Sequence, residues 1–237
     1  MKTAGIIGGI GPESTVDYYR LILSIYRERT RDGSYPSVLI NSIDPKRMLD
    51  LIESDQLAEV TGYLASEVRR LASAGADFGL LAANTPHIVF DALAAESPIP
   101  LISIVDATCR AALAQGFKRV GLLGTRFTMG SRFYPDAFLA AGIELVAPAP
   151  DEQRLIHERY MRELVPGVFR TQTRAEFSAI IERLRTEEKI DGLVLGGTEL
   201  PLLLRESENC AIPLLDTTRL HAEEAVTYLL ALPNSPN

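Results

Sequence analysis

Ala4-Gly5-Ile6-Ile7-Gly8 is a short apolar run, and Gly9-Ile10-Gly11-Pro12 follows it directly. A nearly continuous apolar stretch bounded by glycines predicts a strand that is buried on both faces. The next segment, about 14–30, has helical length, and Ser14 with Asp17 three residues later predicts a capped helix N-terminus. This order of strand, glycine turn and helix is typical of the first unit of a parallel α/β fold.

The same alternation continues along the chain. The predicted strands are 3–8, 37–41, 78–82, 101–104, 119–123, 193–195 and 213–215. The predicted helices are about 14–30, 55–74, 107–115, 131–141, 151–164, 174–187 and 218–230. Strands that alternate with helices predict parallel sheets with right-handed crossovers.

The opening strand has a second copy. Val120-Gly121-Leu122-Leu123-Gly124 resembles residues 4–8. Asp191 precedes an apolar run, as Asp77 does, and Ile212-Pro213-Leu214 resembles Ile99-Pro100-Leu101. The three matches come in the same order at nearly constant spacing, which indicates a duplicated α/β unit. In such sheets ligands bind beyond the carboxyl ends of the strands, so two facing halves would enclose a cleft.

Composition excludes several classes of protein. Of 237 residues, 46% are hydrophobic, 23% are charged and the net charge is −7, without a strong basic cluster, which argues against nucleic-acid and anionic-membrane surfaces. No apolar stretch approaches about 20 residues, and the first apolar run is too short and glycine-rich for a signal peptide. Cys109 and Cys210 have no metal or redox spacing, so a reducing cytoplasm is the expected location.

Polar residues follow the predicted strands in both halves. Asn84 and Thr85 end the strand from Phe78, and Thr198 with Glu199 occupies the matching place in the second half. Their amide and hydroxyl groups can hold a carboxylate or cap a helix. Glu199 is a candidate base, or a first-turn carboxylate favoured by a helix dipole. His87 is a candidate acid/base or a structural residue.

The glycine-led loops and nearby cations suggest how an anion would bind. Backbone groups at Gly9 and Ile10, and Thr125 with Arg126 in the second half, are candidate contacts. Arg47, with Lys46, is the candidate cation for a second carboxylate of the substrate. A dinucleotide site is disfavoured because Pro12 removes one N–H donor and no acidic residue follows at the expected spacing.

Together these blocks resemble the cofactor-independent aspartate/glutamate racemase family. The resemblance covers nearly the whole chain and is carried by residues 8–19, 84–87, 123–129, 195–200 and 215–218. It implies two Rossmann-like lobes related by pseudo-two-fold symmetry, 1–104 plus 216–237 and 105–215, with a cleft between them. It also implies a homodimer, an aspartate- or glutamate-like amino acid as substrate, and no pyridoxal phosphate or metal.

The chain departs from the family pattern at the two catalytic thiols. These thiols stand just before Asn-Thr and just before Thr-Glu, where this chain has Ala83 and Gly197. Neither side chain can carry a proton, and the two cysteines present match neither position. Some members also carry a lysine facing the substrate in the segment matching 163–167, where this chain has Val165 and Pro166.

Three interpretations follow from the missing thiols. The protein is an amino-acid racemase or epimerase with substitute bases, a non-catalytic carboxylate binder, or an enzyme for another reaction such as decarboxylation, lyase or hydrolase chemistry. The candidate substitute groups are Glu199, His87, Glu13, Thr85 and Thr198. The substitutions Ala83→Cys and Gly197→Cys together are expected to raise racemase activity if the cleft is otherwise intact.

Overall fold

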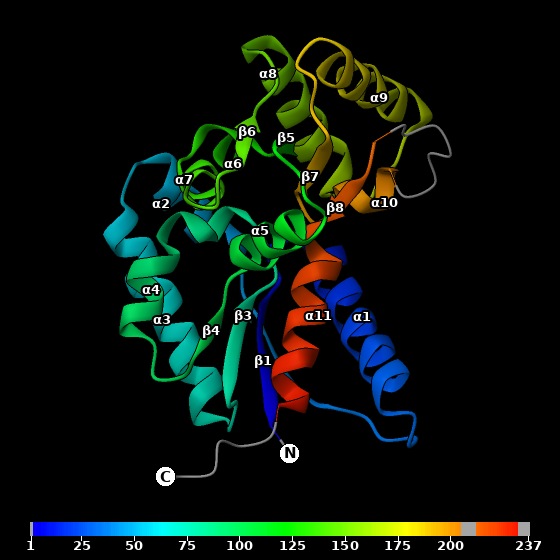
Figure 1. Cartoon of the computed structure of the whole chain (residues 1–237). Coiled ribbons are helices and arrows are strands. Elements are labelled where there is room, and N and C mark those ends of the chain that lie inside the picture. Colours follow the sequence, from blue (N-terminus) through cyan, green and yellow to red (C-terminus); the bar gives the residue numbers. More distant parts are fainter. Residues whose placement is uncertain (1, 205–211, 232–237) are drawn as a thin grey trace.

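Two four-stranded parallel sheets make up the protein in the computed structural model, which describes residues 2–204 and 212–231. Cys210 lies outside these ranges. The first sheet has the order β2-β1-β3-β4, with strands β1 (Thr3–Gly8), β2 (Ser37–Ser42), β3 (Phe78–Leu81) and β4 (Leu101–Ile102). The second has the order β6-β5-β7-β8, with strands β5 (Arg119–Gly124), β6 (Glu144–Val146), β7 (Gly192–Gly196) and β8 (Leu214–Asp216). The equivalent strand orders confirm the predicted α/β fold with two similar lobes (Figure 1).

Helices connect the strands in both lobes. In the first half these are α1 (Pro12–Thr30), α2 (Pro45–Glu53), α3 (Leu57–Ser73), the 3₁₀ helix η1 (Thr85–Val89) and α4 (Phe90–Glu96). The second half has α5 (Ile104–Ala114), α6 (Arg126–Gly130), α7 (Phe133–Ala140), α8 (Pro150–Arg159), the π-helical turn η2 (Tyr160–Leu164), α9 (Thr171–Thr186) and α10 (Leu200–Leu204), and α11 (Thr217–Leu230) ends the described chain. None of these helices is long and apolar enough to cross a membrane.

Helix α2 was not predicted from the sequence, although its start carries a clear signal. The side chain of Asp44 accepts a hydrogen bond from the Lys46 backbone N–H at 2.9 Å, and Pro45 occupies the first helical position. Both features favour a helix N-terminus. Helix α2 matters for the site because Pro45 and Leu49 lie at the cavity described below.

Alternate residues of the first sheet pack against different helical layers. Ile6 and Leu80 lie in a cluster with apolar residues of α1 and α11, whereas Ile7 and Leu81 pack with residues of α2, α3 and α4. This is the two-residue period of a strand covered on both faces. Figure 1 shows α11 beside α1 along β1. The last helix therefore packs against the first sheet.

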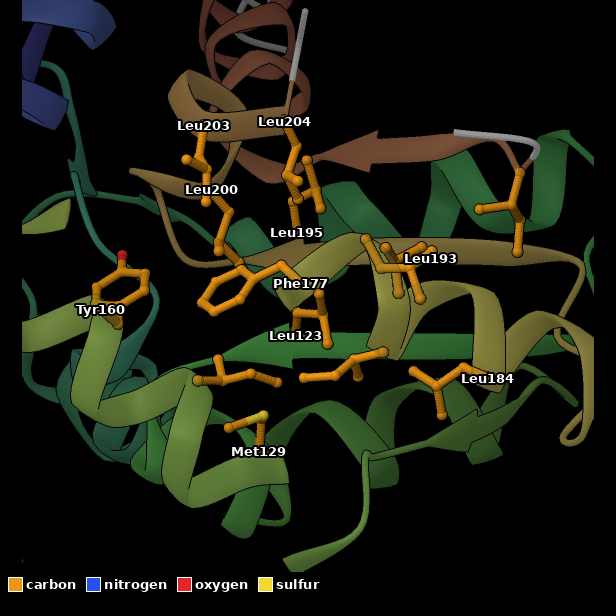
Figure 2. Packing of buried hydrophobic residues seen from close by; sticks show 14 of the residues in the cluster. Leu123, Met129, Tyr160, Phe177, Leu184, Leu193, Leu195, Leu200, Leu203 and Leu204 are labelled. Atoms are coloured by element: carbon orange, nitrogen blue, oxygen red, sulfur yellow. The ribbon is translucent and has the colours of Figure 1, made fainter. Parts of the chain in front are cut away.

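The second sheet repeats this pattern. Leu122 and Val194 pack with residues of α5 and α7, and Leu123 and Leu195 pack with residues of α8, α9 and α10. Figure 2 shows the latter cluster, with Tyr160 at its edge. The helices of the second lobe thus hold a tyrosine at the boundary between the apolar core and the cavity between the lobes.

Candidate functional site

A cavity of about 90 Å³ lies where the carboxyl ends of the strands of both lobes meet. Its lining includes residues that follow β1, β3, β5 and β7, which is where open α/β sheets bind ligands. The polar lining residues are Asn84, Thr85, Thr125, Tyr160, Thr198 and Glu199. The residues with little or no side chain are Gly11, Ala83, Gly196 and Gly197. The apolar lining residues are Ile10, Pro45, Leu49, Phe127, Met161 and Val165.

Asn84 is held rigidly on the first-lobe side of the cavity. Tyr134 of α7 donates a hydrogen bond to Asn84 Oδ1 at 2.6 Å, and Asn84 Nδ2 donates to Thr217 Oγ1 at 3.2 Å. Burial raises the pKa of Tyr134 above its ordinary value, so its hydroxyl stays protonated and remains a donor. The second half of the chain therefore sets the orientation of a first-lobe amide.

We expect Tyr134→Phe to lower the free energy of unfolding by about 1–3 kcal/mol, because the buried Asn84 Oδ1 loses its donor. Urea unfolding measures this loss. Tyr63→Phe is the control, since its hydroxyl makes only an exposed 3.5 Å contact with the Asp44 carbonyl, and it should change stability by less than about 0.5 kcal/mol. An equal effect of the two substitutions would contradict the role given to Tyr134.

Two threonine hydroxyls meet across the lobes. Thr85 Oγ1 and Thr125 Oγ1 are 3.3 Å apart, and both residues are buried. The Thr125 side chain also accepts a hydrogen bond from the Thr128 N–H at 3.3 Å and so caps α6. A hydroxyl can both donate and accept, so this pair can bind a carboxylate oxygen at the cavity wall.

Glu199 is a buried carboxylate surrounded by hydroxyl groups. It is 2% exposed, Ser14 Oγ donates to its Oε1 at 2.5 Å, and Thr198 Oγ1 donates to its Oε2 at 3.2 Å. Tyr160 donates a short hydrogen bond to the same Oε2. These described side-chain partners carry no positive charge. Hydroxyl groups of both lobes therefore donate hydrogen bonds to this one carboxylate.

Ser14 links this network to the first lobe, and its predicted role as the N-cap of α1 is wrong. The cap residue is Gly11, which makes no side-chain cap, and Ser14 lies inside the first turn with its hydroxyl on Glu199 and Thr198. A Cβ on Gly11 would collide with Glu199 Oε1. The carboxylate of one lobe therefore lies against the N-terminus of the long helix of the other, where the helix dipole favours negative charge.

Tyr160 fills the space beside Gly197. A Cβ built on Gly197 would lie 2.5 Å from Cε2, 2.7 Å from the hydroxyl oxygen and 2.9 Å from Cζ of Tyr160. The tyrosine starts the π-helical turn η2, in which the Val165 N–H donates to the Tyr160 carbonyl at 3.0 Å. Such turns are frequent at functional sites. Burial, and next the Glu199 charge, hold the pKa of Tyr160 well above 10.

His87 does not line the cavity, and both of its ring nitrogens bond to backbone. The Ile104 N–H donates to Nε2 at 3.1 Å, so Nδ1 carries the proton and donates to the Ala83 carbonyl at 3.0 Å. Burial lowers the pKa of His87 to about 3. Of its two proposed roles, this geometry supports the structural one.

The predicted cations lie on the surface rather than at the cavity. Lys46 pairs with Asp50 at 2.6 Å, Arg47 stacks on the ring of Tyr63, and Arg126 pairs with Glu53 at 2.6 Å. These residues are exposed, and so is Glu13. Gly9 has φ +82°, and its N–H donates to Thr15 Oγ1 at 2.8 Å, so this N–H is already used within the loop.

The structure thus brings together most of the predicted site residues: Ile10, Ala83, Asn84, Thr85, Thr125, Gly197, Thr198 and Glu199. Sequence reasoning missed Tyr160 and Ser14. Tyr160 lies within a predicted helix and has no local signal, because only the fold places it beside Gly197. Within residues 2–204 and 212–231, no group of three His, Cys, Asp or Glu side chains could hold a metal ion.

Comparison with known proteins agrees with this fold. The model of the family Asp/Glu/Hydantoin racemase matches residues 7–225. The chain is 22% identical over 233 residues to the broad specificity amino-acid racemase RacX of Bacillus subtilis, covering 96% of this chain and 98% of that one. A Yersinia pestis structure described as a candidate Asp/Glu racemase is 30% identical with a TM-score of 0.88, covering 98% of this chain and 100% of that one. An aspartate racemase homologue from Pyrococcus horikoshii is 34% identical with a TM-score of 0.83, covering 97% and 99%.

Proposed function

The chain belongs to the Asp/Glu/Hydantoin racemase family, and we propose that it is a racemase-type isomerase that moves the α-proton of a small amino acid in the cavity between its lobes. The observation that carries this proposal is the lining itself. Asn84, Thr85, Thr125 and Thr198 supply neutral hydrogen-bonding groups for the α-carboxylate. These side chains come from both lobes and surround the cavity, and Glu199 lines the same cavity.

The reaction proceeds without a cofactor and without the two-thiol mechanism. Ala83 and Gly197 both line the cavity, and neither has a group that could exchange a proton. Cys109 is buried in the cluster around α5 and α7, away from the cavity lining. Among the described residues, another group must therefore take the α-proton.

The substrate side chain is small and neutral rather than acidic. The described lining contains no Lys or Arg, and Glu199 is its one charged residue. Leu49, Phe127, Met161 and Val165 form an apolar wall. A second substrate carboxylate would lose its hydration there without gaining an opposite charge, which is costly. The family resemblance implies an aspartate- or glutamate-like substrate, and on this lining we propose a neutral side chain instead.

Exchange of the α-proton in D₂O tests the proposal. The L- and D-forms of alanine, valine, aspartate and glutamate are incubated with the protein and followed by NMR and chiral chromatography. We expect deuterium at Cα of the neutral amino acids, with at least about tenfold slower exchange for the dicarboxylates, which corresponds to about 1.4 kcal/mol.

Two other outcomes would contradict the proposed activity. If an amino acid raises the thermal stability of the protein but its α-proton does not exchange, the protein is a non-catalytic carboxylate binder. A loss of mass from the substrate would support decarboxylase, lyase or hydrolase chemistry. The domain boundaries, assembly as a homodimer and a cytoplasmic location stay predictions of the sequence.

A further inference from the structure

We propose that Tyr160 and Glu199 together form the proton-transfer group of this cavity, acting from the second-lobe side. The inference rests on the proposed function and specifies how a chain without thiols could perform it. Its basis is the position of the pair, its hydrogen bonds and the chemistry of the rest of the lining.

Tyr160 occupies the space beside Gly197. Gly197 has no side chain, and the ring and hydroxyl of Tyr160 occupy the volume into which a side chain at 197 would project. A phenol therefore stands beside this backbone position, at the same side of the cavity. The glycine is required because any Cβ would displace the ring.

Acidic side chains line the cavity only on its second-lobe side, among the residues that the structure describes. Among the described residues that line the cavity, only Tyr160 and Glu199 belong to side-chain types whose ordinary pKa is about 10 or lower. Both belong to the second lobe. The first-lobe side presents Ala83, Asn84 and Thr85, which have no such group. The pair therefore exchanges the α-proton on one face of the substrate, and inversion requires water to deliver a proton to the other face.

Hydrogen bonds connect Tyr160, Glu199 and Ser14 into a path for a proton. Tyr160 donates its hydroxyl proton to Glu199 Oε2, and Ser14 donates to Oε1. When Tyr160 passes its proton to the carboxylate, its oxygen accepts the proton from Cα. The C–H bond breaks, its electron pair stays on the substrate as a carbanion, and Glu199 becomes neutral. Reversal of the same steps returns a proton or a deuteron to Cα.

The environment supports this relay. The raised pKa of Tyr160 keeps the phenol protonated in the resting state, so it acts as a relay rather than as a free phenolate. The hydroxyls of Ser14 and Thr198 and the N-terminus of α1 lie against Glu199, and the described lining holds no Lys or Arg that could pair with it. A base without a tightly paired cation is free to accept a proton.

Exchange in D₂O with one enantiomer at saturating concentration tests the pair. We expect deuterium to enter with retention faster than inversion occurs. Tyr160→Phe and Glu199→Gln should each slow exchange at saturation by about 10²-fold or more. Tyr160→Phe keeps the ring beside Gly197, so it tests the relay even if Glu199→Gln destabilises the protein.

Matched controls remove the same groups elsewhere. Tyr18→Phe deletes a buried hydroxyl that bonds His221, and Glu67→Gln neutralises a buried carboxylate that pairs with Arg70. Both controls should exchange at the unaltered rate. Wild-type rates in Tyr160→Phe and Glu199→Gln, or a change in KM alone, would overturn the relay and leave the proposed function standing. No exchange by the unaltered protein would overturn both.

Discussion

Thiol-dependent racemisation is expected from the variant Ala83→Cys/Gly197→Cys/Tyr160→Ala, and not from Ala83→Cys/Gly197→Cys alone. The cavity already brings positions 83 and 197 together, but Tyr160 fills the space beside 197. With the tyrosine in place, a side chain at 197 is overpacked, which costs about 1–3 kcal/mol and turns the sulfur away from the cavity. Removing the ring restores room for the second thiol. This changes the sequence-based expectation that the two cysteines would suffice.

The expected gain is about 10²-fold or more in racemisation over the two-site variant, since each positioned acid or base contributes about that much. Chiral chromatography of alanine or valine measures it, and iodoacetamide should abolish it. The matched control is Ala83→Ser/Gly197→Ser/Tyr160→Ala, which has the same space but hydroxyls in place of thiols. Equal activity of the two-site and three-site cysteine variants would contradict the steric role of Tyr160.

Stability is expected to fall as the pH is lowered from 7 towards 4, because two histidines are buried in neutral form. Burial lowers the pKa of His87 to about 3 and that of His221 to about 4. His221 donates from Nε2 to the Ile102 carbonyl at 2.9 Å and accepts from Tyr18 at Nδ1. A proton on His87 Nε2 would meet the Ile104 N–H. One ring nitrogen of each histidine therefore accepts a hydrogen bond, from the Ile104 N–H or from the Tyr18 hydroxyl, which favours the neutral ring.

The direction of this effect follows from proton linkage. The unfolded chain binds protons at these sites near pH 6.5, and the folded chain does so only near pH 3 to 4. The contribution of the two neutral histidines to stability is complete above pH 6.5. It is lost as the pH falls from 6.5 towards the folded-state pKa values of about 3 and about 4. At pH 4.5 the loss is about 2–3 kcal/mol for each histidine.

Urea unfolding between pH 7 and 4.5 measures this loss. His87→Gln and His221→Gln keep a hydrogen-bonding amide but remove the titration. Each should make the slope of unfolding free energy against pH shallower by about 1.4 kcal/mol per pH unit below 6.5. An unchanged slope in both variants would contradict the assignment of these histidines as neutral core residues.

The sequence by itself determined the fold and the place of the site. Apolar runs with glycine ends define the strands, and their repetition defines two lobes, because the burial of a strand on both faces leaves a local pattern. Residues 83–85 and 197–199 could be assigned to the cavity because they follow strands, and the carboxyl ends of parallel strands lie on the same edge of a sheet. The absence of the two thiols followed from the resemblance to the racemase family, whose pattern has them at positions 83 and 197.

Only the tertiary structure decided the chemistry of the site. Ser14, Tyr160 and Glu199 come from α1, η2 and the loop after β7, and no local pattern indicates that they meet. The same holds for Arg47 and Arg126, whose surface partners lie in other elements. A backbone pattern is set by neighbours along the chain, whereas a hydrogen-bond partner or a filled volume is set by neighbours in space. For this reason the missing thiols could be seen in the sequence, and the tyrosine that fills the place of one could not.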